Sequence, residues 1–520
     1  MIGTVRFALC IALCTGGVAR GAELLQQPDS AVFHSGTRLV EVEVVVRDQP
    51  VRPPGIGSFF SWTLDSGPPF GPPGTLRKGL TKDDFTLLDN GKPQPITVLR
   101  VGASSDAKPL PKPPGAVSNR EDSAGQPLNG ATVVLIDQLN TEFDTTDYAR
   151  LGIIKLLRSL GQSGGRVAVY TLGERLHILH DFNEDPSTLT DLAAKLDRPH
   201  GQLPPDLASA LRDYGDLMDL GKEQVHGQMT ANAVKLIAQH LSGVPGRKNL
   251  IWMFDEPNNA PPPLVASLSI TIARQSNIIV YPVVIRTVTC ATCPHLELDR
   301  EHYTRQLAAA TGGRAFFDAM DLPFAVQAAE EDSRTAYVLG YYPDEEMLDG
   351  KYHTITVKLR DKTGIPKAAE LNYRPGYLAT KSAVPPPAPT PRELFEGPVN
   401  SAGIGLVAQA VPDTAHPGLY DLRVTVDLHD IHLERKDGHF IGAFDVSVPN
   451  PSAKGTVNTA TVSIDLTDAQ VDAALENGGA VTLSGLQAQA GELRVVVRDR
   501  STGTAGSLRI PIETRGGQGK

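Results

Sequence analysis

Two aspartates stand at the ends of strongly apolar segments, where a folded chain could use their carboxylates for binding. The first segment, ATVVLID, ends at Asp137, and the second, KNLIWMFD, ends at Asp255. Short continuous apolar runs of this kind are typical of strands buried on both faces of a parallel sheet. Ligands of such sheets bind just beyond the carboxyl ends of the strands. The sequence therefore predicts a recognition edge at which Asp137 stands.

The segments around these aspartates alternate between strands and helices. Asp137 is followed by an amphipathic helix at Thr145 to Leu160, and Arg166 to Leu172 pairs with Leu176 to Phe182 as a tight hairpin. Further helices are expected at Ser187–Leu196, Leu207–Leu220, Gln224–Leu241, Leu264–Ser276 and His302–Thr311, and strands at Lys248–Phe254, Ile278–Ile285 and Ala315–Phe317. This order predicts an α/β domain over residues 130–334, with a mostly parallel sheet and helices on both faces.

Strand patterns of a different kind flank this domain. Thr37 to Asp48 alternates apolar and polar residues, and Leu80 to Val101 has the pattern of a hairpin. They predict a small β domain over residues 22–102, which we expect residues 335–378 to complete. A Pro-, Ser- and Gly-rich linker is expected at 103–129, and a stiff Pro-rich linker at 379–392. Residues 393–515 contain about seven strand-like runs, a number that suits a β-sandwich.

The strand, acidic loop and helix that begin at Ala131 resemble the start of a von Willebrand factor type A domain, a Rossmann-like fold. The segments LTKDDFTLLDNGKPQPI, GRKNLIWMFDE, LAAATGGRAFF and TAYVLGYYPDEEMLDGKYHTITVKLRD are similar to a group of secreted bacterial proteins related to that domain. The resemblance covers residues 37–378. It implies protein binding by analogy with the wider fold, since the group has no assigned activity.

The resemblance also implies a divalent-cation site. In the type A fold, hydroxyls and carboxylates from three loops hold the cation, and the corresponding positions here are Asp137, Thr141, Thr230 and Asp255. The first loop of the family is normally Asp-x-Ser-x-Ser, but this chain reads Asp-Gln-Leu-Asn-Thr, which puts Leu139 at a ligand position. Oxygen donors suit Mg²⁺, or alternatively Mn²⁺ or Ca²⁺, but Mg²⁺ wants six ligands and this set is incomplete.

Two interpretations of the aspartates therefore stay open. In one, they belong to a degenerate metal site that a water or Asn140 completes. In the other, Asp137 and Asp255 bind no ion and only cap helices and satisfy loop amides.

Other chemical signals in the chain are weaker. Gly161 to Gly165 reads GQSGG and matches the Gly-x-Ser-x-Gly pattern of hydrolases, but a helix precedes Ser163 and a strand follows, the reverse of a nucleophile elbow. Cys290 and Cys293 are expected to form a local disulfide near the recognition edge, with a redox pair as the alternative. The residues Asp427, His429, His432 and Glu434 are interpreted as an exposed polar strand rather than a metal site.

Composition and the first residues bear on where the protein works. The net charge is −10 without a basic block, which argues against nucleic acid as the main partner. Residues 1–21 resemble a signal peptide, with an apolar core at Phe7–Leu13 and a small-x-small cleavage site. We expect a secreted or periplasmic, non-enzymatic protein with no membrane span after cleavage, which mediates protein–protein interaction or adhesion. The alternatives are a secreted hydrolase, a Cys-x-x-Cys oxidoreductase, or a purely structural module of the cell envelope.

Overall fold

The structure is a computed structural model. The residues that it describes are 39–48, 75–102, 109–139, 147–163, 166–197, 222–255, 263–285, 304–317, 321–360, 369–380, 388–416, 418–450, 456–487 and 491–512. The predicted signal peptide, Thr141, the predicted helix at Leu207–Leu220, Cys290 and Cys293 lie outside these residues.

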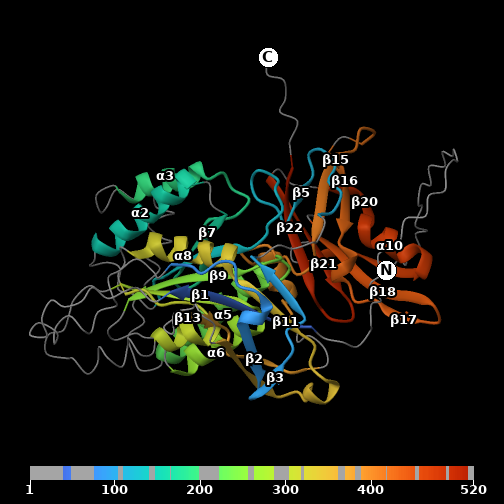
Figure 1. Cartoon of the computed structure of the whole chain (residues 1–520). Coiled ribbons are helices and arrows are strands. Elements are labelled where there is room, and N and C mark those ends of the chain that lie inside the picture. The colour runs from blue at the N-terminus through green and yellow to red at the C-terminus, as the bar shows by residue number, and fades with distance from the viewer. Residues whose placement is uncertain are drawn as a thin grey trace, which may run out of the picture.

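A five-stranded sheet forms the centre of the α/β domain, in the order β10-β9-β6-β7-β8 (Figure 1). The strands are β6 (Ala131–Asp137), β7 (Val167–Leu172), β8 (Leu176–His180), β9 (Lys248–Asp255) and β10 (Ile278–Ile285). All neighbours pair in parallel except β7 and β8, which form the predicted antiparallel hairpin. Every residue of β6 and β7 is buried, because helices cover both faces of the sheet.

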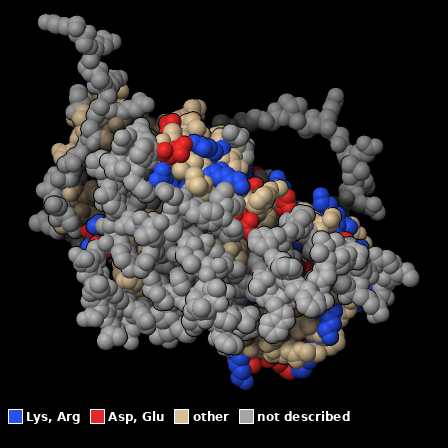
Figure 2. All heavy atoms as spheres, turned by 90° about the vertical axis from the view of Figure 1, so that its left-hand side faces the viewer, with Lys and Arg blue, Asp and Glu red and all other residues tan. Residues whose placement is uncertain are grey.

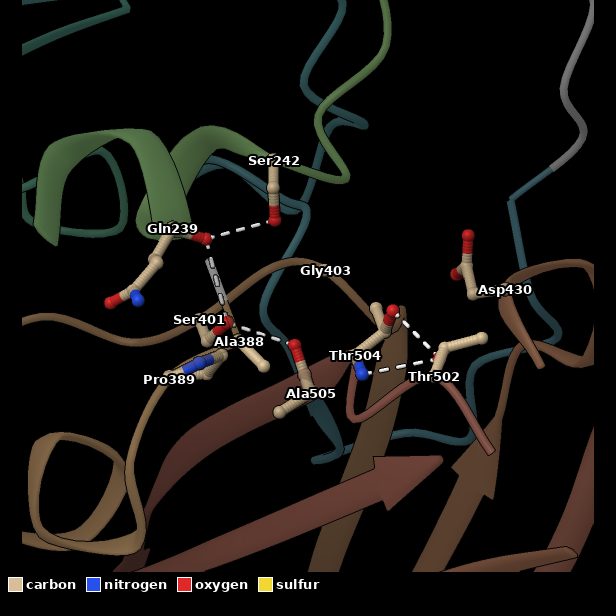
Figure 3. Close-up of a pocket in the computed structure, with 10 residues that line it drawn as sticks. All are labelled: Gln239, Ser242, Ala388, Pro389, Ser401, Gly403, Asp430, Thr502, Thr504 and Ala505. Atoms are coloured by element: carbon tan, nitrogen blue, oxygen red, sulfur yellow. Dashed lines mark hydrogen bonds between the residues drawn. The ribbon is translucent and has the colours of Figure 1, made fainter. Parts of the chain in front are cut away.

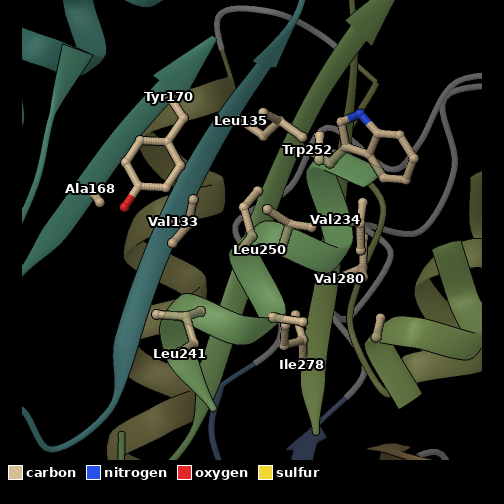
Figure 4. Packing of buried hydrophobic residues seen from close by; sticks show 14 of the residues in the cluster. Val133, Leu135, Ala168, Tyr170, Val234, Leu241, Leu250, Trp252, Ile278 and Val280 are labelled. Carbon is tan, nitrogen blue, oxygen red and sulfur yellow. The ribbon is translucent and has the colours of Figure 1, made fainter. Parts of the chain in front are cut away.

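Each face of the sheet has its own apolar core. On one face lie α2 (Asp147–Ser163), α3 (Ser187–Leu196) and α8 (Leu322–Thr335), and on the other lie α5 (Lys222–Leu241) and α6 (Pro263–Gln275). Figure 4 shows the second core, in which Val234 and Leu241 of α5 pack over Leu135 and Leu250 of the strands. The predicted strand at Ala315–Phe317 is reduced to one parallel bridge between Phe316 and Val283.

Two further four-stranded sheets form the N-terminal β domain, in the orders β13-β1-β11-β4 and β14-β12-β2-β3. Their strands are β1 (Val40–Asp48), β2 (Phe85–Asp89), β3 (Lys92–Gln94), β4 (Val98–Val101), β11 (Tyr337–Tyr341), β12 (Tyr352–Leu359), β13 (Ala369–Tyr373) and β14 (Gly376–Leu378). The β2–β3 turn has positive φ at Asn90 (47°) and Gly91 (79°), as the Asn-Gly dipeptide favours. Strands from before and after the α/β domain thus share one core.

The C-terminal β-sandwich has one sheet in the order β20-β16-β15-β5 and another in the order β17-β18-β21-β22, with β19 paired to β18. Its elements are β5 (Val117–Ser118), α9 (Pro391–Glu396), β15 (Leu406–Pro412), β16 (Leu419–Val426), β17 (Glu434–Lys436), β18 (His439–Pro449), β19 (Val457–Thr467), α10 (Asp468–Asn477), β20 (Gly479–Gln487), β21 (Gly491–Asp499) and β22 (Ala505–Ile512).

Strand β5 comes from the segment 103–129, for which the sequence predicts a linker. The side chain of Asn119 explains the difference, because it donates to the carbonyls of Ser401 and Ile404 at 2.9 Å each and accepts from the amide of Leu406 at 2.8 Å. These bonds fix residues 117–119 against the sandwich. The chain therefore contributes to both flanking β domains before it enters the α/β domain, and it returns to both afterwards.

The described helices include none that is both long and apolar enough to cross a membrane.

Candidate functional site

The carboxyl edge of the central sheet brings the predicted acidic positions together. Asp137 ends β6 and Asp255 ends β9, and these two strands are parallel neighbours. Asp255 also lies opposite Ile285, the last residue of β10, after which the segment with Cys290 and Cys293 begins. Three strand ends thus meet at one edge, as expected from the sequence. The side chain of Asp255 lies outside the described part of the structure.

Asp137 is fully buried, and its carboxylate is held by the neighbouring strand. The indole Nε1 of Trp252 donates a hydrogen bond to Asp137 Oδ2 at 2.9 Å. Trp252 is itself 1% exposed, so this bond lies in a region from which water is excluded. A buried carboxylate is costly unless hydrogen bonds satisfy it, and an ionised acceptor makes the bond stronger than one between neutral groups. Trp252 is a partner of Asp137 that the sequence did not reveal.

Leu139 occupies the position where the type A pattern has a hydroxyl, and the structure gives it a different role. Its side chain is 5% exposed and belongs to the core that α5 covers. The amides of Gln138 and Leu139 both donate to the carbonyl of Leu172, at 2.8 and 3.0 Å. The start of the loop is therefore fixed by packing and by backbone bonds to β7.

Gln138 adds a polar atom that the sequence pattern did not single out. The residue is 5% exposed, and its side-chain oxygen has no hydrogen-bond partner among the described residues. A buried amide oxygen without a donor costs about 1–3 kcal/mol, so such atoms normally have a partner. Gln138 directly follows Asp137 and thus places an unmet acceptor at the carboxyl edge.

Thr230 lies inside a helix rather than at its start. Helix α5 begins at Lys222, and the Thr230 hydroxyl donates to the carbonyl of His226, one turn earlier, at 2.9 Å. Leu139 supplies no oxygen. Within the described residues, no three His, Cys, Asp or Glu side chains come together as a metal site requires. The described donors therefore do not fit the six-ligand shell of Mg²⁺.

The opposite, amino edge of the sheet is where the two β domains join the α/β domain. Arg247, just before β9, donates to Glu43 of β1 at 2.9 Å. Gly243, just after α5, lies so close to the sandwich that a Cβ atom there would be 1.7 Å from the carbonyl oxygen of Ala402. Figure 1 shows the sandwich on the right of the α/β domain, at this end of its strands. In the described part of the structure, these contacts of the β domains lie at the amino edge and not at the carboxyl edge where Asp137 stands.

The strand order now identifies the fold. Four parallel strands carry an antiparallel edge strand beside β7, helices lie on both faces, and the acidic positions end β6 and β9. The α/β domain has the von Willebrand factor type A fold.

Comparisons with known proteins add no closer relationship for this type A domain. No family model matches the sequence, and no curated protein matches it. Solved structures with type A domains match about two fifths of the chain. Proximal thread matrix protein 1 from the mussel byssus is 15% identical over 39% of this chain and 48% of its own, with a TM-score of 0.25. This chain thus covers about half of the length of the mussel protein.

Two shorter structures are covered almost completely. An aerotolerance-related membrane protein from Bacteroides fragilis is 12% identical over 39% of this chain and 98% of its own, with a TM-score of 0.25. The N-terminal domain of TFIIH p34 is 12% identical over the same shares, with a TM-score of 0.21.

A cavity of about 250 Å³ lies away from the carboxyl edge, at the seam between α5 and the sandwich (Figure 3). Its hydroxyl groups already have partners: Ser401 donates to the carbonyl of Ala505 at 2.8 Å, Ser242 to that of Gln239 at 3.0 Å, and Thr502 to Thr504 at 2.9 Å. The Ser401 hydroxyl also lies 3.4 Å from the carbonyl oxygen of Gln239, across the seam, so these hydroxyl groups take part in bonds within and between the two domains.

The remaining chemical signals stay apart from this edge. Ser163 ends α2 and a strand follows it, as predicted, so the order of elements is the reverse of a hydrolase elbow. His429 belongs to a 3-10 turn (Leu428–Asp430) and not to the predicted strand, and Asp427 caps this turn by accepting from the His429 amide at 3.1 Å. His432 lies beyond that turn, and its amide donates to Asp499.

Proposed function

We propose that this protein is an exported, non-enzymatic recognition protein whose type A domain binds a protein partner through the loops at its carboxyl edge. The observation that carries the proposal is the contrast between the two edges of the sheet. Both β domains hold the amino edge, whereas the buried ends of β6 and β9 lie at the carboxyl edge, where the segments that follow β9 and β10 begin. Binding residues typically gather on loops that a rigid scaffold holds in place.

The binding edge is degenerate as a metal site. Trp252 satisfies the Asp137 carboxylate, and Leu139 anchors the loop in the core. Protein contacts therefore take over the organising task that a cation has in the type A fold, and partner binding does not depend on Mg²⁺.

Site-specific photo-crosslinking tests the proposal. The photoreactive residue p-benzoylphenylalanine is placed at Asn258, three residues beyond Asp255, and in a control protein at Thr459, an exposed residue of β19. Irradiation of producing cells should give covalent adducts of higher mass from position 258 and none from position 459. Adducts from position 459 alone, or from neither position, would contradict recognition at this edge.

The protein with the photoreactive residue at position 258 also distinguishes the proposed function from the alternative functions. A hydrolase or a Cys-x-x-Cys oxidoreductase should lose its activity on Ser163→Ala or Cys293→Ala, whereas neither change should reduce the crosslink at position 258. A purely structural module should give no crosslink at all.

A further inference from the structure

A patch of exposed apolar and basic side chains lies beside the carboxyl edge of the type A domain. The α2–α8 patch comprises Leu151, Lys155 and Arg158 of α2 and Phe324 of α8. Leu151 is 52% exposed and Phe324 is 54% exposed, among the largest values for apolar residues of the described chain. Single exposed apolar residues are common on protein surfaces, so the patch has significance only if its members adjoin one another.

Helix geometry and a cation–π contact show that they do. Leu151, Lys155 and Arg158 are spaced by four and three residues and therefore form one ridge of α2. The Lys155 ammonium lies 5.6 Å from the centroid of the Phe324 ring, which joins this ridge to α8. The two helices also pack together over the same face of the sheet.

The patch is locally basic on an acidic protein. Helix α2 carries Arg150, Lys155 and Arg158, and after its first residue, Asp147, it contains no Asp or Glu, whereas the whole chain has a net charge of −10. Arg158 pairs with Asp197 at 2.6 Å, but no described carboxylate forms an ion pair with Lys155. Figure 2 shows Lys and Arg side chains next to Asp and Glu side chains in the upper part of the face turned toward the viewer.

The apolar end of the patch adjoins the proposed recognition edge. Helix α2 starts on the carboxyl side of β6, and Leu151 lies in its second turn. Helix α8 starts shortly after Phe316, which bridges to Val283 near the carboxyl end of β10, and Phe324 is its third residue. A partner bound at the carboxyl edge could therefore extend over Leu151 and Phe324 without crossing either β domain.

We propose that the α2–α8 patch docks an acidic segment of the protein partner that also bears large apolar side chains. This inference rests on the proposed function and extends the same binding site. Leu151 and Phe324 supply apolar contact area, and Lys155 supplies an ammonium that pairs with no described carboxylate and complements a carboxylate of the partner. An anionic lipid surface fits less well, because the net charge of −10 opposes approach to it and two apolar side chains give little insertion.

A peptide-display selection with the full chain tests the inference. A random peptide library is selected on the natural protein, and the selected peptides are then measured against two variants. The first combines Leu151→Ser, Lys155→Glu and Phe324→Ser. The matched control combines Ile441→Ser, Lys436→Glu and Val457→Ser, which changes two exposed apolar residues and one exposed lysine on the sandwich. The single variant Lys155→Glu serves if the triple variant melts earlier than the natural protein.

The expected peptides are rich in Asp and Glu with Leu, Phe or similar residues. They should bind the natural protein and the control equally, and the patch variant at least about tenfold more weakly, as the loss of 1.4 kcal/mol would give. Selection of neutral or basic peptides, unchanged binding to the patch variant, or no selection at all would overturn the inference. Patch-dependent binding to vesicles of anionic phospholipid without acidic peptides would also overturn it, and would identify a lipid surface instead.

The outcomes also separate this inference from the function on which it rests. Peptides that bind the patch variant normally but lose binding on Asp255→Ala would leave recognition at the carboxyl edge in place and remove the patch from it. Loss of the crosslink at position 258 concerns the edge itself and is measured independently.

Discussion

At the scale of single residues, the bond between Trp252 and Asp137 is the contact that organises the edge. Because the carboxylate is fully buried, loss of the indole donor leaves one of its oxygens without that partner. Trp252→Phe should therefore lower the free energy of unfolding by about 1–3 kcal/mol beyond the loss of ring contacts. Denaturant unfolding of Trp252→Phe, Asp137→Asn and the double variant measures this in a thermodynamic cycle. Strictly additive effects would show that the two side chains do not interact.

The sequence could predict Asp137 but not its partner. The run ATVVLID locates a buried strand end from local pattern alone, and the same reasoning locates Asp255. Trp252 lies 115 residues from Asp137 in the chain, and in the sequence it is indistinguishable from the other apolar residues of its strand. Its role appears only when the strand register sets β9 beside β6. That the Gln138 side-chain oxygen lacks a partner among the described residues likewise depends on burial, which residue type does not encode.

At the scale of elements, a core residue, Leu139, stands in the first loop where the type A pattern has a hydroxyl. Leu139→Ser restores the hydroxyl of the family pattern but removes a buried side chain, so we expect it to lower the free energy of unfolding by about 2–5 kcal/mol. Leu151→Ser is the matched control, since Leu151 is about half exposed and its change should stay within about 0.5 kcal/mol. Chemical denaturation of both variants measures the difference. Equal effects would show that Leu139 is not packed in the core.

Apolar periodicity predicts the described helices and strands of the α/β domain well. The prediction of a linker at 103–129 is wrong where β5 forms. A two-residue strand has too short a pattern to recognise, and β5 depends on pairing with β15 and on bonds from Asn119 to backbone groups more than 280 residues away. Thr230 illustrates a similar limit, because the sequence located its helix but not how far inside the helix the residue lies.

At the scale of the whole molecule, buried charges join the α/β domain to its neighbours. Asp332 of α8 is 1% exposed, accepts from Arg47 of β1, and accepts from the Tyr281 hydroxyl at 2.9 Å. Asp332→Asn leaves the buried guanidinium of Arg47 without its carboxylate and should cost about 3–5 kcal/mol of stability. The matched control is Glu331→Gln, because the Glu331 carboxylate is more exposed and 4.0 Å from Arg47, so its change should be below about 1 kcal/mol. Similar costs for both variants would contradict a buried junction.

A histidine at the seam with the sandwich makes stability depend on pH. His240 lies between two acceptors: its Nδ1 is 2.5 Å from the carbonyl oxygen of Asn400, and its Nε2 is 3.3 Å from an Asp181 carboxylate oxygen, a distance at which a protonated ring forms an ion pair. Burial alone would lower the pKa of His240, but the Asp181 carboxylate and these bonds raise it above its ordinary value, although Arg494 opposes them. In turn His240 and the amide of Phe182 hold the pKa of Asp181 below its usual range against burial.

The sign of the pH effect follows from the raised pKa of His240. Its contribution to stability is complete below the unfolded pKa, about 6.5, and is lost as pH rises through the folded pKa. The stability advantage of the natural protein over His240→Phe should therefore shrink between neutral and alkaline pH in denaturant unfolding. His180→Phe is the control of opposite sign, because burial lowers the pKa of His180. A His240→Phe difference that stays constant or grows with pH would contradict the charged pair.

The central claim is that contacts within the chain, rather than a cation, hold the carboxyl edge in its binding form. The most direct measurement is the thermal unfolding midpoint of the full chain in a chelator and in millimolar Mg²⁺, Mn²⁺ or Ca²⁺. An ion that binds the folded state raises the midpoint by mass action. We predict the same midpoint in all four conditions for the natural protein, and a lower but equally ion-independent midpoint for Trp252→Phe. A midpoint that rises with the concentration of one ion, and loses that dependence on Asp137→Ala, would contradict the claim and restore the metal site.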